Sequence, residues 1–268
     1  MTSQTTAPRL ADIQLHPIKS LDPVHIKETR IGPGGGIEFD RAWALYSVDG
    51  QWVNGKRSAT AYLIRAAFAP DLSSVTLSVP DDRRKIATKT FAFPADTAGA
   101  AKWFSTFFEQ QITVRHSPEG FPDDFVANGP TVVSTASLQT IAGLFPGMTL
   151  EDARLRFRTT LEIDDVPAFW EDQLFGKEER SAVRFRIGEV NFEGSNPCAR
   201  CPVPPRNPHT GEIIPGFQKA FCDFRRSHIP DWTPEARFDH YYYLATNTRV
   251  ASSETDKFIR VGDPLQLI

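Results

Sequence analysis

The chain has 268 residues, and its 30 Lys and Arg stand against 33 Asp and Glu, a net charge of −3. With 40% hydrophobic and 24% charged residues it is long enough to bury a core, which excludes wholesale disorder and any need for disulfides or a structural metal. The near-neutral charge argues against a broad nucleic-acid footprint, and three cysteines are too few for a secreted disulfide scaffold.

The start of the chain is not typical of a secretory signal. It is polar, then mixed, with no apolar run or small-residue cleavage site of the kind that a secretory signal needs. The most apolar stretch, Ala59 to Ala69, is interrupted by Arg65 and is too short to span a bilayer. We therefore expect a soluble, cytoplasmic protein without a clear membrane segment.

In the first part of the chain, alternating apolar and polar residues predict strands. Such runs lie near Ile13 and from Val24 to Arg30, and the residues from Trp43 to Val53 form a hairpin around a tight Asp49-Gly50 turn. A helix follows, for which Thr97 is the candidate cap. Its aromatic stripe is expected to pack into the core and consists of Trp103, Phe104, Phe107 and Phe108.

The segment from Pro118 to Pro130 is rich in Pro, Gly, Asp and Asn and predicts a boundary between two parts. We place an N-terminal domain at residues 1–122 and a second domain at 123–268. The second part is expected to contain a helix capped by Ser134 or Thr135, a strand from Arg154 to Ile163, a hairpin from Ala182 to Phe192 and a late helix marked by Phe217, Phe221 and Phe224. The sum is a mainly β (α+β) fold, a two-part β-barrel-like architecture with a few packed helices.

A proline-rich loop beginning Cys198-Ala-Arg200-Cys201 is the sharpest chemical feature. Prolines stiffen it, and the cation of Arg200 favours a thiolate nearby, so it is a plausible reactive site. Two small buried side chains, a zinc site or a thioredoxin-like redox pair remain open. A zinc site would need His209 and Cys222 as further ligands, and the sequence has no second C-x-x-C motif. A redox pair would need a βαβ unit around it, which the sequence does not show. Cys222 lies among phenylalanines of a predicted helix and is expected to be a buried side chain.

Basic residues at the ends of predicted strands form a second, weaker signal. Lys19, Ser20, Arg41 and Lys56 could converge on a phosphate if the strands curl into a barrel, because lysine offers a point charge and arginine a bidentate fork. Surface cations are common and usually solvated, so the pattern alone does not define a site. No Walker A loop, G-x-G-x-x-G or serine nucleophile elbow is present in the sequence.

Five motifs, in order along the chain, carry a resemblance to a known family. They are His16-Pro-Ile-Lys19-Ser20, Phe39-Asp40-Arg41-Ala-Trp43, Ser134-Thr-Ala-Ser137-Leu138, Cys198-Ala-Arg-Cys201 with Asn207-Pro-His-Thr210-Gly211, and Ile259-Arg-Val-Gly262-Asp263-Pro264. With them the chain resembles the MOSC superfamily, and most of all its members with an N-terminal MOSC β-barrel domain, such as the mitochondrial amidoxime-reducing component and its bacterial relatives. The chain departs from the family at Thr159-Thr160, where Pro-Asn is usual, and at Asn207, where Asp is usual.

The resemblance implies a molybdenum cofactor, Mo-molybdopterin, held between the two parts. Cys201 would be the catalytic residue and the ligand of the metal, a soft thiolate suited to a thiophilic ion. The resemblance also brings an association with pyridoxal phosphate binding. The implied cofactor-binding residues are Lys19, Ser20, Arg41, Lys56, Ser134, Ser137, Arg158, Thr160 and Arg200.

By the same resemblance the chain is expected to be a molybdenum-dependent oxidoreductase that reduces small N-hydroxylated or related N-oxygenated substrates. The sequence as given leaves no room for a haem or iron–sulfur domain, so electrons would come from a separate haem or iron–sulfur protein. The acidic pairs Glu171-Asp172 and Glu178-Glu179 could dock this donor or form a solvated face. The alternative function is a carrier of the cofactor or of sulfur, with Cys201 as a persulfide site.

Overall fold

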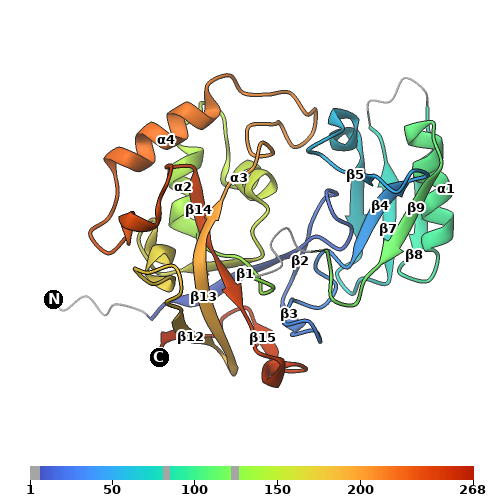
Figure 1. Cartoon of the computed structure of the whole chain (residues 1–268). Coiled ribbons are helices and arrows are strands. Elements are labelled where there is room, and N and C mark those ends of the chain that lie inside the picture. Colours follow the sequence, from blue (N-terminus) through green and yellow to red (C-terminus); the bar gives the residue numbers. More distant parts are fainter. Residues whose placement is uncertain (1–6, 81–84, 122–126) are drawn as a thin grey trace.

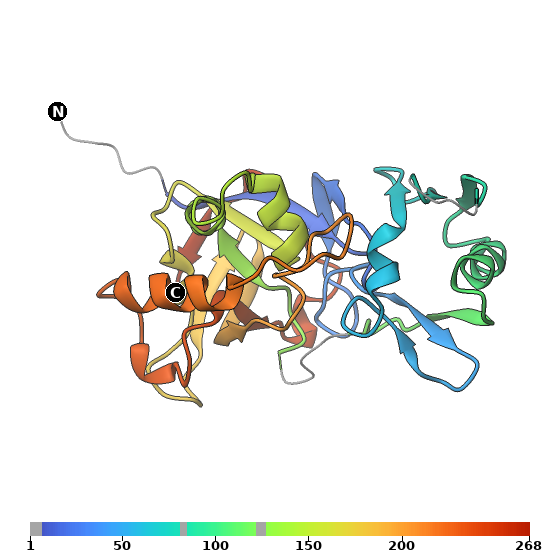
Figure 2. The same ribbon diagram turned by 90° about the horizontal axis from the view of Figure 1, so that it is seen from above.

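The computed structural model describes residues 7–80, 85–121 and 127–268. Two lobes lie side by side in both views, a larger one containing both described ends of the chain and a smaller one built around α1 (Thr97–Phe108) (Figures 1 and 2). The expected domain boundary at 122/123 lies outside the described residues. No helix in the described part of the chain combines the length and the apolar character that crossing a bilayer requires.

An eight-stranded sheet forms the frame of the larger lobe. Its neighbours are antiparallel except for one parallel pair, β10 with β11. In spatial order the sheet consists of β16 (Leu265–Leu267), β12 (Val183–Ile187), β13 (Val190–Ala199), β14 (Tyr243–Arg249), β10 (Val132–Ser134), β11 (Leu161–Asp164), β1 (Arg9–Leu15) and β2 (Val24–Ile26). The predicted hairpin from Ala182 to Phe192 is confirmed as β12 and β13.

Three α-helices cover the larger lobe: α2 (Thr135–Ala142), α3 (Leu150–Phe157) and α4 (Phe217–Ser227). The predicted Ser134 cap is confirmed, because its hydroxyl accepts the backbone N–H of Ser137. The late helix is confirmed as α4. Short 3₁₀ turns complete the lobe at η2 (Trp170–Leu174), η3 (Glu235–Arg237) and η4 (Ser252–Glu254).

The strand expected from Arg154 to Ile163 was wrong in its first half. A capping box between Thr149 and Asp152 starts α3, and this helix runs to Phe157 before β11 begins at Leu161. The helix buries Ala153, Arg156 and Phe157, a spacing of three and four residues, whereas the alternation of charged and apolar residues suggested a period of two. The helix ends at Arg158, whose backbone is left-handed.

The smaller lobe contains two three-stranded sheets and α1. The predicted Asp49-Gly50 hairpin is confirmed as β4 and β5. Asp96, and not Thr97, caps α1, since the Asp96 carboxylate accepts the N–H of Gly99. The sheets are β5 (Trp52–Val53), β4 (Trp43–Ser47) and β9 (Ile112–His116), and β6 (Arg65–Phe68), β7 (Ser74–Ser78) and β8 (Lys89–Ala92), with the turn η1 (Ala59–Leu63) before β6.

The mainly β, two-part fold is confirmed, but the described strands do not close into a barrel. The N-terminal segment instead joins both parts of the chain. Strands β1 and β2 lie in the large sheet, where β1 pairs with β11, and β3 (Glu28–Arg30) pairs with β15 (Phe258–Arg260). The chain therefore crosses to the smaller lobe only after β3, and the residues between β1 and β4 lie where the two lobes meet.

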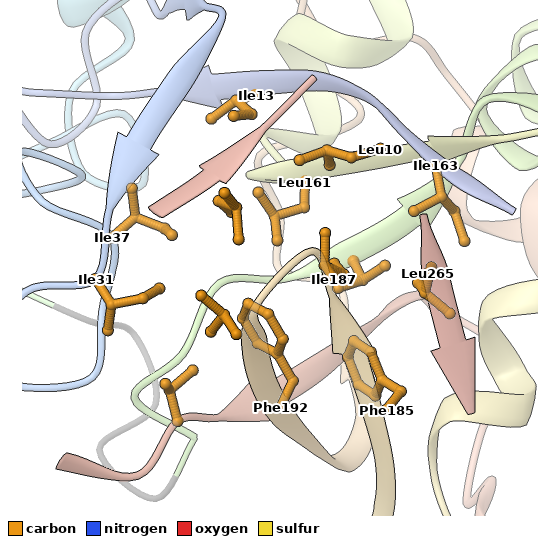
Figure 3. Packing of buried hydrophobic residues seen from close by; sticks show 14 of the residues in the cluster. Leu10, Ile13, Ile31, Ile37, Leu161, Ile163, Phe185, Ile187, Phe192 and Leu265 are labelled. Carbon is orange, nitrogen blue, oxygen red and sulfur yellow. The ribbon is translucent and has the colours of Figure 1, made fainter. Parts of the chain in front are cut away.

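Aliphatic and aromatic side chains from the large sheet and the N-terminal segment form the core of the larger lobe (Figure 3). A second cluster lies under α1, where Trp103, Phe104 and Phe107 are buried as the aromatic stripe predicted and Phe108 is partly buried. The side chains labelled in Figure 3 are Leu10, Ile13, Ile31, Ile37, Leu161, Ile163, Phe185, Ile187, Phe192 and Leu265. Phe39 and Phe68 pack against both clusters and so connect the two cores.

Candidate functional site

A cavity of about 610 Å³ lies at this junction and is lined by residues of both lobes. This volume is in the range of small-molecule and cofactor sites. Eight of the ten site residues expected from the sequence line it, although they are scattered over more than 180 positions of the chain. They are Lys19, Ser20, Arg41, Lys56, Arg158, Thr160, Arg200 and Cys201.

Ser134 and Ser137 lie elsewhere, fully buried at the start of α2. The Ser134 hydroxyl is the helix cap, and the Ser137 hydroxyl donates to Glu171 Oε2 at 3.0 Å and accepts from the N–H of Phe169 at 2.6 Å. Both hydroxyls therefore serve the interior of the larger lobe. The structure does not bring them to the cavity.

Three of the polar residues that line the cavity have a left-handed backbone, which residues with a Cβ adopt rarely. The φ angles are 74° at Ser20, 52° at Arg41 and 53° at Arg158. Each residue stands at a sharp turn: Ser20 after β1, Arg41 before β4 and Arg158 at the end of α3. These turns present consecutive polar side chains to the cavity.

Arg41 connects the lobes around a buried carboxylate. Its Nη2 donates to the carbonyl oxygen of Arg158 at 2.8 Å, and its Nη1 pairs with Asp40. Thr160 donates from Oγ1 to Asp40 Oδ2 at 3.2 Å. Thr160 thus holds the carboxylate that holds Arg41, a role that the sequence did not indicate.

Behind this network lies His16, whose ring is fully buried. Its backbone N–H donates to Asp40 Oδ1 at 2.9 Å, while neither ring nitrogen has a hydrogen-bond partner among the described residues. Burial lowers the pKa of His16 far below its usual value, and the charges of Arg158 and Arg41 lower it further. The imidazole is therefore neutral and adds no charge to the cavity wall.

The cavity is strongly cationic. Among the described residues that line it, eight are Lys or Arg and three are Asp or Glu, an excess of five positive charges in a chain with a net charge of −3. Burial, and then the neighbouring Arg41, lower the pKa of Arg158 to about 10. Its Nη2 donates to the carbonyl oxygen of Leu21 at 2.9 Å. A half-buried cation close to a second cation is stabilised by an anion, so the cavity favours a negatively charged ligand.

Lys19 is fixed at the wall of the smaller lobe. Its Nζ donates to the carbonyl oxygen of Phe121 at 2.9 Å and lies 4.2 Å from the centre of the Trp52 ring. Phe121 and Trp52 both line the cavity. The site therefore has an aromatic wall beside its cations.

The loop that carries Cys201 is held by backbone contacts. Arg156 donates from Nη1 to the carbonyl oxygens of Pro204, at 3.0 Å, and of Arg206, at 2.6 Å. The side-chain oxygen of Asn207 accepts the N–H groups of His209 and Thr210 at 2.8 and 3.1 Å. An amide oxygen accepts these two bonds as a carboxylate would, so Asn207 can replace the family's aspartate in this turn.

The three cysteines are unpaired. Of the two nearby thiols, Arg200 contacts that of Cys198: its Nη1 lies 3.0 Å from Cys198 Sγ, and its other side-chain bonds go to the carbonyl oxygens of Phe157 and Leu244. No three His, Cys, Asp or Glu side chains among the described residues are placed to hold a metal ion, so the zinc alternative with His209 and Cys222 was wrong.

Sequence reasoning missed Tyr62, Asp22 and the role of Arg65, which all line the cavity. The Tyr62 hydroxyl is buried without a hydrogen-bond partner among the described residues, and burial raises its pKa. Gly55 packs against it, because a Cβ at this position would lie 2.7 Å from the hydroxyl oxygen. In the sequence, Arg65 is a single charge within the apolar stretch from Ala59 to Ala69. That charge was the signal that could have indicated a functional role for this residue.

The acidic pair proposed to dock an electron donor is mostly internal. Glu171 is fully buried and Asp172 is 4% exposed, so neither offers charge to a partner. Glu178 and Glu179 are exposed and remain candidates.

The fold and the cavity agree with the comparisons with known proteins. Residues 7–111 match the family described as the MOSC N-terminal beta barrel domain. The resemblance to MOSC proteins predicted from the five motifs is therefore confirmed.

The similar curated proteins are molybdenum cofactor sulfurases. That of Drosophila ananassae is 27% identical over 240 residues, which cover 79% of this chain and 30% of the relative. That of Caenorhabditis elegans is 22% identical over 241 residues, covering 84% and 33%. The chain thus spans about 30% of the length of the curated relatives it matches. Together these likenesses support a function related to the molybdenum cofactor.

Proposed function

We propose that the chain holds a molybdenum cofactor in the cavity between its lobes and reduces N-hydroxylated or related N-oxygenated compounds. The observation that supports this most is that Cys201 lines one cavity together with described residues that carry an excess of five positive charges. Mo-molybdopterin combines a phosphate, a hydrogen-bonding pterin and a thiophilic metal, so it needs cations, polar groups and a soft ligand together. The residues present fit these needs.

In this proposal Cys201 is the protein ligand of molybdenum. Lys19, Arg41 and Arg158 bind the phosphate, because all three line the cavity and Arg158 has no carboxylate in direct contact among the described residues. Ser20 offers a hydroxyl to the pterin, while Thr160 acts through Asp40 by fixing Arg41. Lys56 and Arg200 complete the positive wall.

The bound cofactor would supply two-electron redox chemistry between Mo(VI) and Mo(IV). The chain's own residues orient a small substrate against it and limit access of water, with the aromatic wall of Trp52 and Phe121 offering apolar contact. Electrons come from a separate haem or iron–sulfur protein. Pyridoxal phosphate is not part of this proposal, since no observation of the cavity favours it over the metal-binding cofactor.

A second candidate is a carrier of the cofactor or of sulfur, with Cys201 as a persulfide site. It is favoured by the names of the similar proteins, which are sulfurases and not reductases. The same cavity and the same thiol would serve this function. Metal content and the oxidation state of the sulfur distinguish the two candidates.

The test is expression of the full chain in a host that makes the cofactor. Molybdenum is measured by mass spectrometry of the metal, and benzamidoxime reduction is measured with a chemically reduced viologen as electron donor. Stoichiometric molybdenum with turnover supports the reductase, whereas a persulfide on Cys201 without metal supports the carrier. Cys201→Ser is expected to abolish molybdenum retention, and Cys198→Ala to lower it less.

Cys222→Ser is the matched control, because Cys222 lies on α4 and outside the cavity lining. It is expected to keep the molybdenum content of the unmodified chain. Equal molybdenum in the Cys201 and Cys222 variants would contradict the assignment of the ligand.

A further inference from the structure

Cys198 is a second thiol of the same cavity, and neither the reductase nor the carrier proposal uses it. It lies near the end of β13, half-buried against the helical core, and its sulfur faces the Arg200 guanidinium at 3.0 Å. A nearby guanidinium stabilises negative charge on a sulfur and so favours the reactive thiolate. Arg200, which lies between the two cysteines in sequence, therefore stabilises negative charge at Cys198.

The position of Arg200 is fixed by bonds other than the one to sulfur. Its backbone N–H donates to the carbonyl oxygen of Tyr242 at 2.9 Å, Nη2 donates to the carbonyl oxygen of Phe157, and Nη1 also lies 3.5 Å from the carbonyl oxygen of Leu244. These groups belong to β14, its preceding residue and the end of α3. The fold therefore holds the cation against Cys198 without any rearrangement.

The third cysteine provides a contrast within the same chain. Cys222 lies on α4 and outside the cavity lining, and burial raises the pKa of its thiol. The charge of Arg226 lowers this pKa, but its effect is smaller than that of burial. Exposure alone does not separate the two thiols, since both are half-buried.

We propose that Cys198 is an Arg200-activated thiol and a site of reversible oxidation by peroxides. The Cys198 thiolate attacks one oxygen of hydrogen peroxide, the S–O bond forms as the O–O bond breaks, and hydroxide leaves. The sulfur loses two electrons and the peroxide gains them, giving a sulfenic acid. Two molecules of a small thiol then return it to the thiol, with one disulfide and one water as products.

This inference goes beyond the proposed function, because the activation involves only Arg200 and Cys198 and holds whether or not a metal is bound. Its consequence for the site is local. A sulfenic oxygen on Cys198 adds a polar group to a wall that Cys201 shares. Oxidation would therefore change the cavity without consuming the Cys201 thiol.

The experiment exposes the purified full chain to hydrogen peroxide at pH 7 with dimedone present, and peptide mass spectrometry measures labelling at each cysteine over time. Cys198 is expected to be labelled about tenfold faster than Cys222. Labelling of Cys198 no faster than that of Cys222, or labelling of Cys201 ahead of Cys198, overturns the proposal. A parallel time course with iodoacetamide reports thiolate reactivity without oxidation.

Arg200→Gln removes the cation and is expected to slow labelling of Cys198 at least fivefold, while Arg200→Lys, which keeps a charge, restores part of the rate. Because Arg200 also braces α3, circular dichroism checks that each variant is folded. The comparison among the three cysteines of the unmodified chain needs no variant and decides the question if a variant does not fold. If Cys198 is labelled by dimedone at an unchanged rate in a folded Arg200→Gln variant, the proposal is overturned. Molybdenum content measured in the same samples tests the proposed function separately.

Discussion

Arg65 Nη1 lies 2.6 Å from Nδ1 of His209, although 144 residues separate the two in sequence. A guanidinium has no acceptor, so the imidazole nitrogen accepts this bond. Nη2 of the same arginine donates to the carbonyl oxygens of Pro208, at 3.1 Å, and of Tyr62. One residue of the smaller lobe therefore ties the loop that follows Cys201 across the cavity.

Arg65→Gln is expected to loosen this loop without unfolding either lobe. It removes bonds to Pro208 and His209, each worth about 1 kcal/mol. Hydrogen–deuterium exchange should become faster in residues 202–216, while the strands of the large sheet keep their protection. Arg184→Gln, which removes an exposed ion pair with Glu193, is the control and should leave the loop unchanged. Unaltered exchange in the loop of the Arg65 variant would show that other contacts fix it.

Gly211 makes the second contact of this loop with the smaller lobe. Its φ is +76°, and an added Cβ would lie 3.0 Å from the carbonyl oxygen of Ala59 and 3.3 Å from the Tyr62 ring. Gly211→Ala is therefore expected to cost about 1 kcal/mol for the backbone and more for the contact. Gly147→Ala has the same backbone strain, with φ +78°, but meets no atom within 4 Å. Thermal unfolding should show a larger loss for Gly211→Ala, and equal losses would rule out the contact.

The elements that the sequence predicted correctly depend on neighbouring residues. The Asp49-Gly50 turn and the Ser134 cap each involve residues within three positions of one another. The segment from Arg154 to Ile163 failed because two periodicities were possible there, and the capping box at Thr149 selected the helix. The capping residues Thr149 and Asp152 lie before Arg154, and so outside the segment whose alternation predicted a strand.

The composition of the site could be predicted in part, and its contacts could not. The resemblance implied Arg41, Arg158 and Cys201 as residues of one site, and all three line one cavity. Which sulfur Arg200 faces depends on a side-chain torsion and on distant carbonyls, which no spacing in sequence encodes. The Ser134 motif likewise marks a buried helix start and not a wall of the cavity.

Arg158 is the lining cation whose loss should weaken anion binding most. It is desolvated beside Arg41, so a bound anion relieves repulsion as well as gaining a charge-assisted hydrogen bond. Inorganic phosphate should raise the melting temperature of the chain, and Arg158→Gln should weaken phosphate binding about tenfold, the equivalent of about 1.4 kcal/mol. Titration calorimetry measures this. Arg260→Gln, an exposed arginine paired with Glu28, is the control, and equal affinities in the two variants would remove Arg158 from the anion site.

The buried carboxyl group of Glu171 links stability to pH. Ser137 donates to its Oε2, while its Oε1 has no hydrogen-bond partner among the described residues. Burial, and then the charge of Asp172, raise the pKa of Glu171 from 4.5 to about 7. Asp172 is buried as well, which raises its pKa, although it pairs with Arg225 and accepts a bond from Thr233 at 2.6 Å.

Because the folded chain binds the Glu171 proton more tightly than the unfolded chain, its contribution to stability is complete below pH 4.5 and is lost as the pH rises through about 7. The loss is on the order of 3 kcal/mol. Glu171→Gln cannot ionise, so above pH 7 it should be more stable than the unmodified chain and its melting temperature should vary less between pH 5 and 8. Glu179→Gln, an exposed carboxylate, should keep the original pH profile. If Glu171→Gln and the unmodified chain lose stability in parallel over this range, the titrating group lies elsewhere.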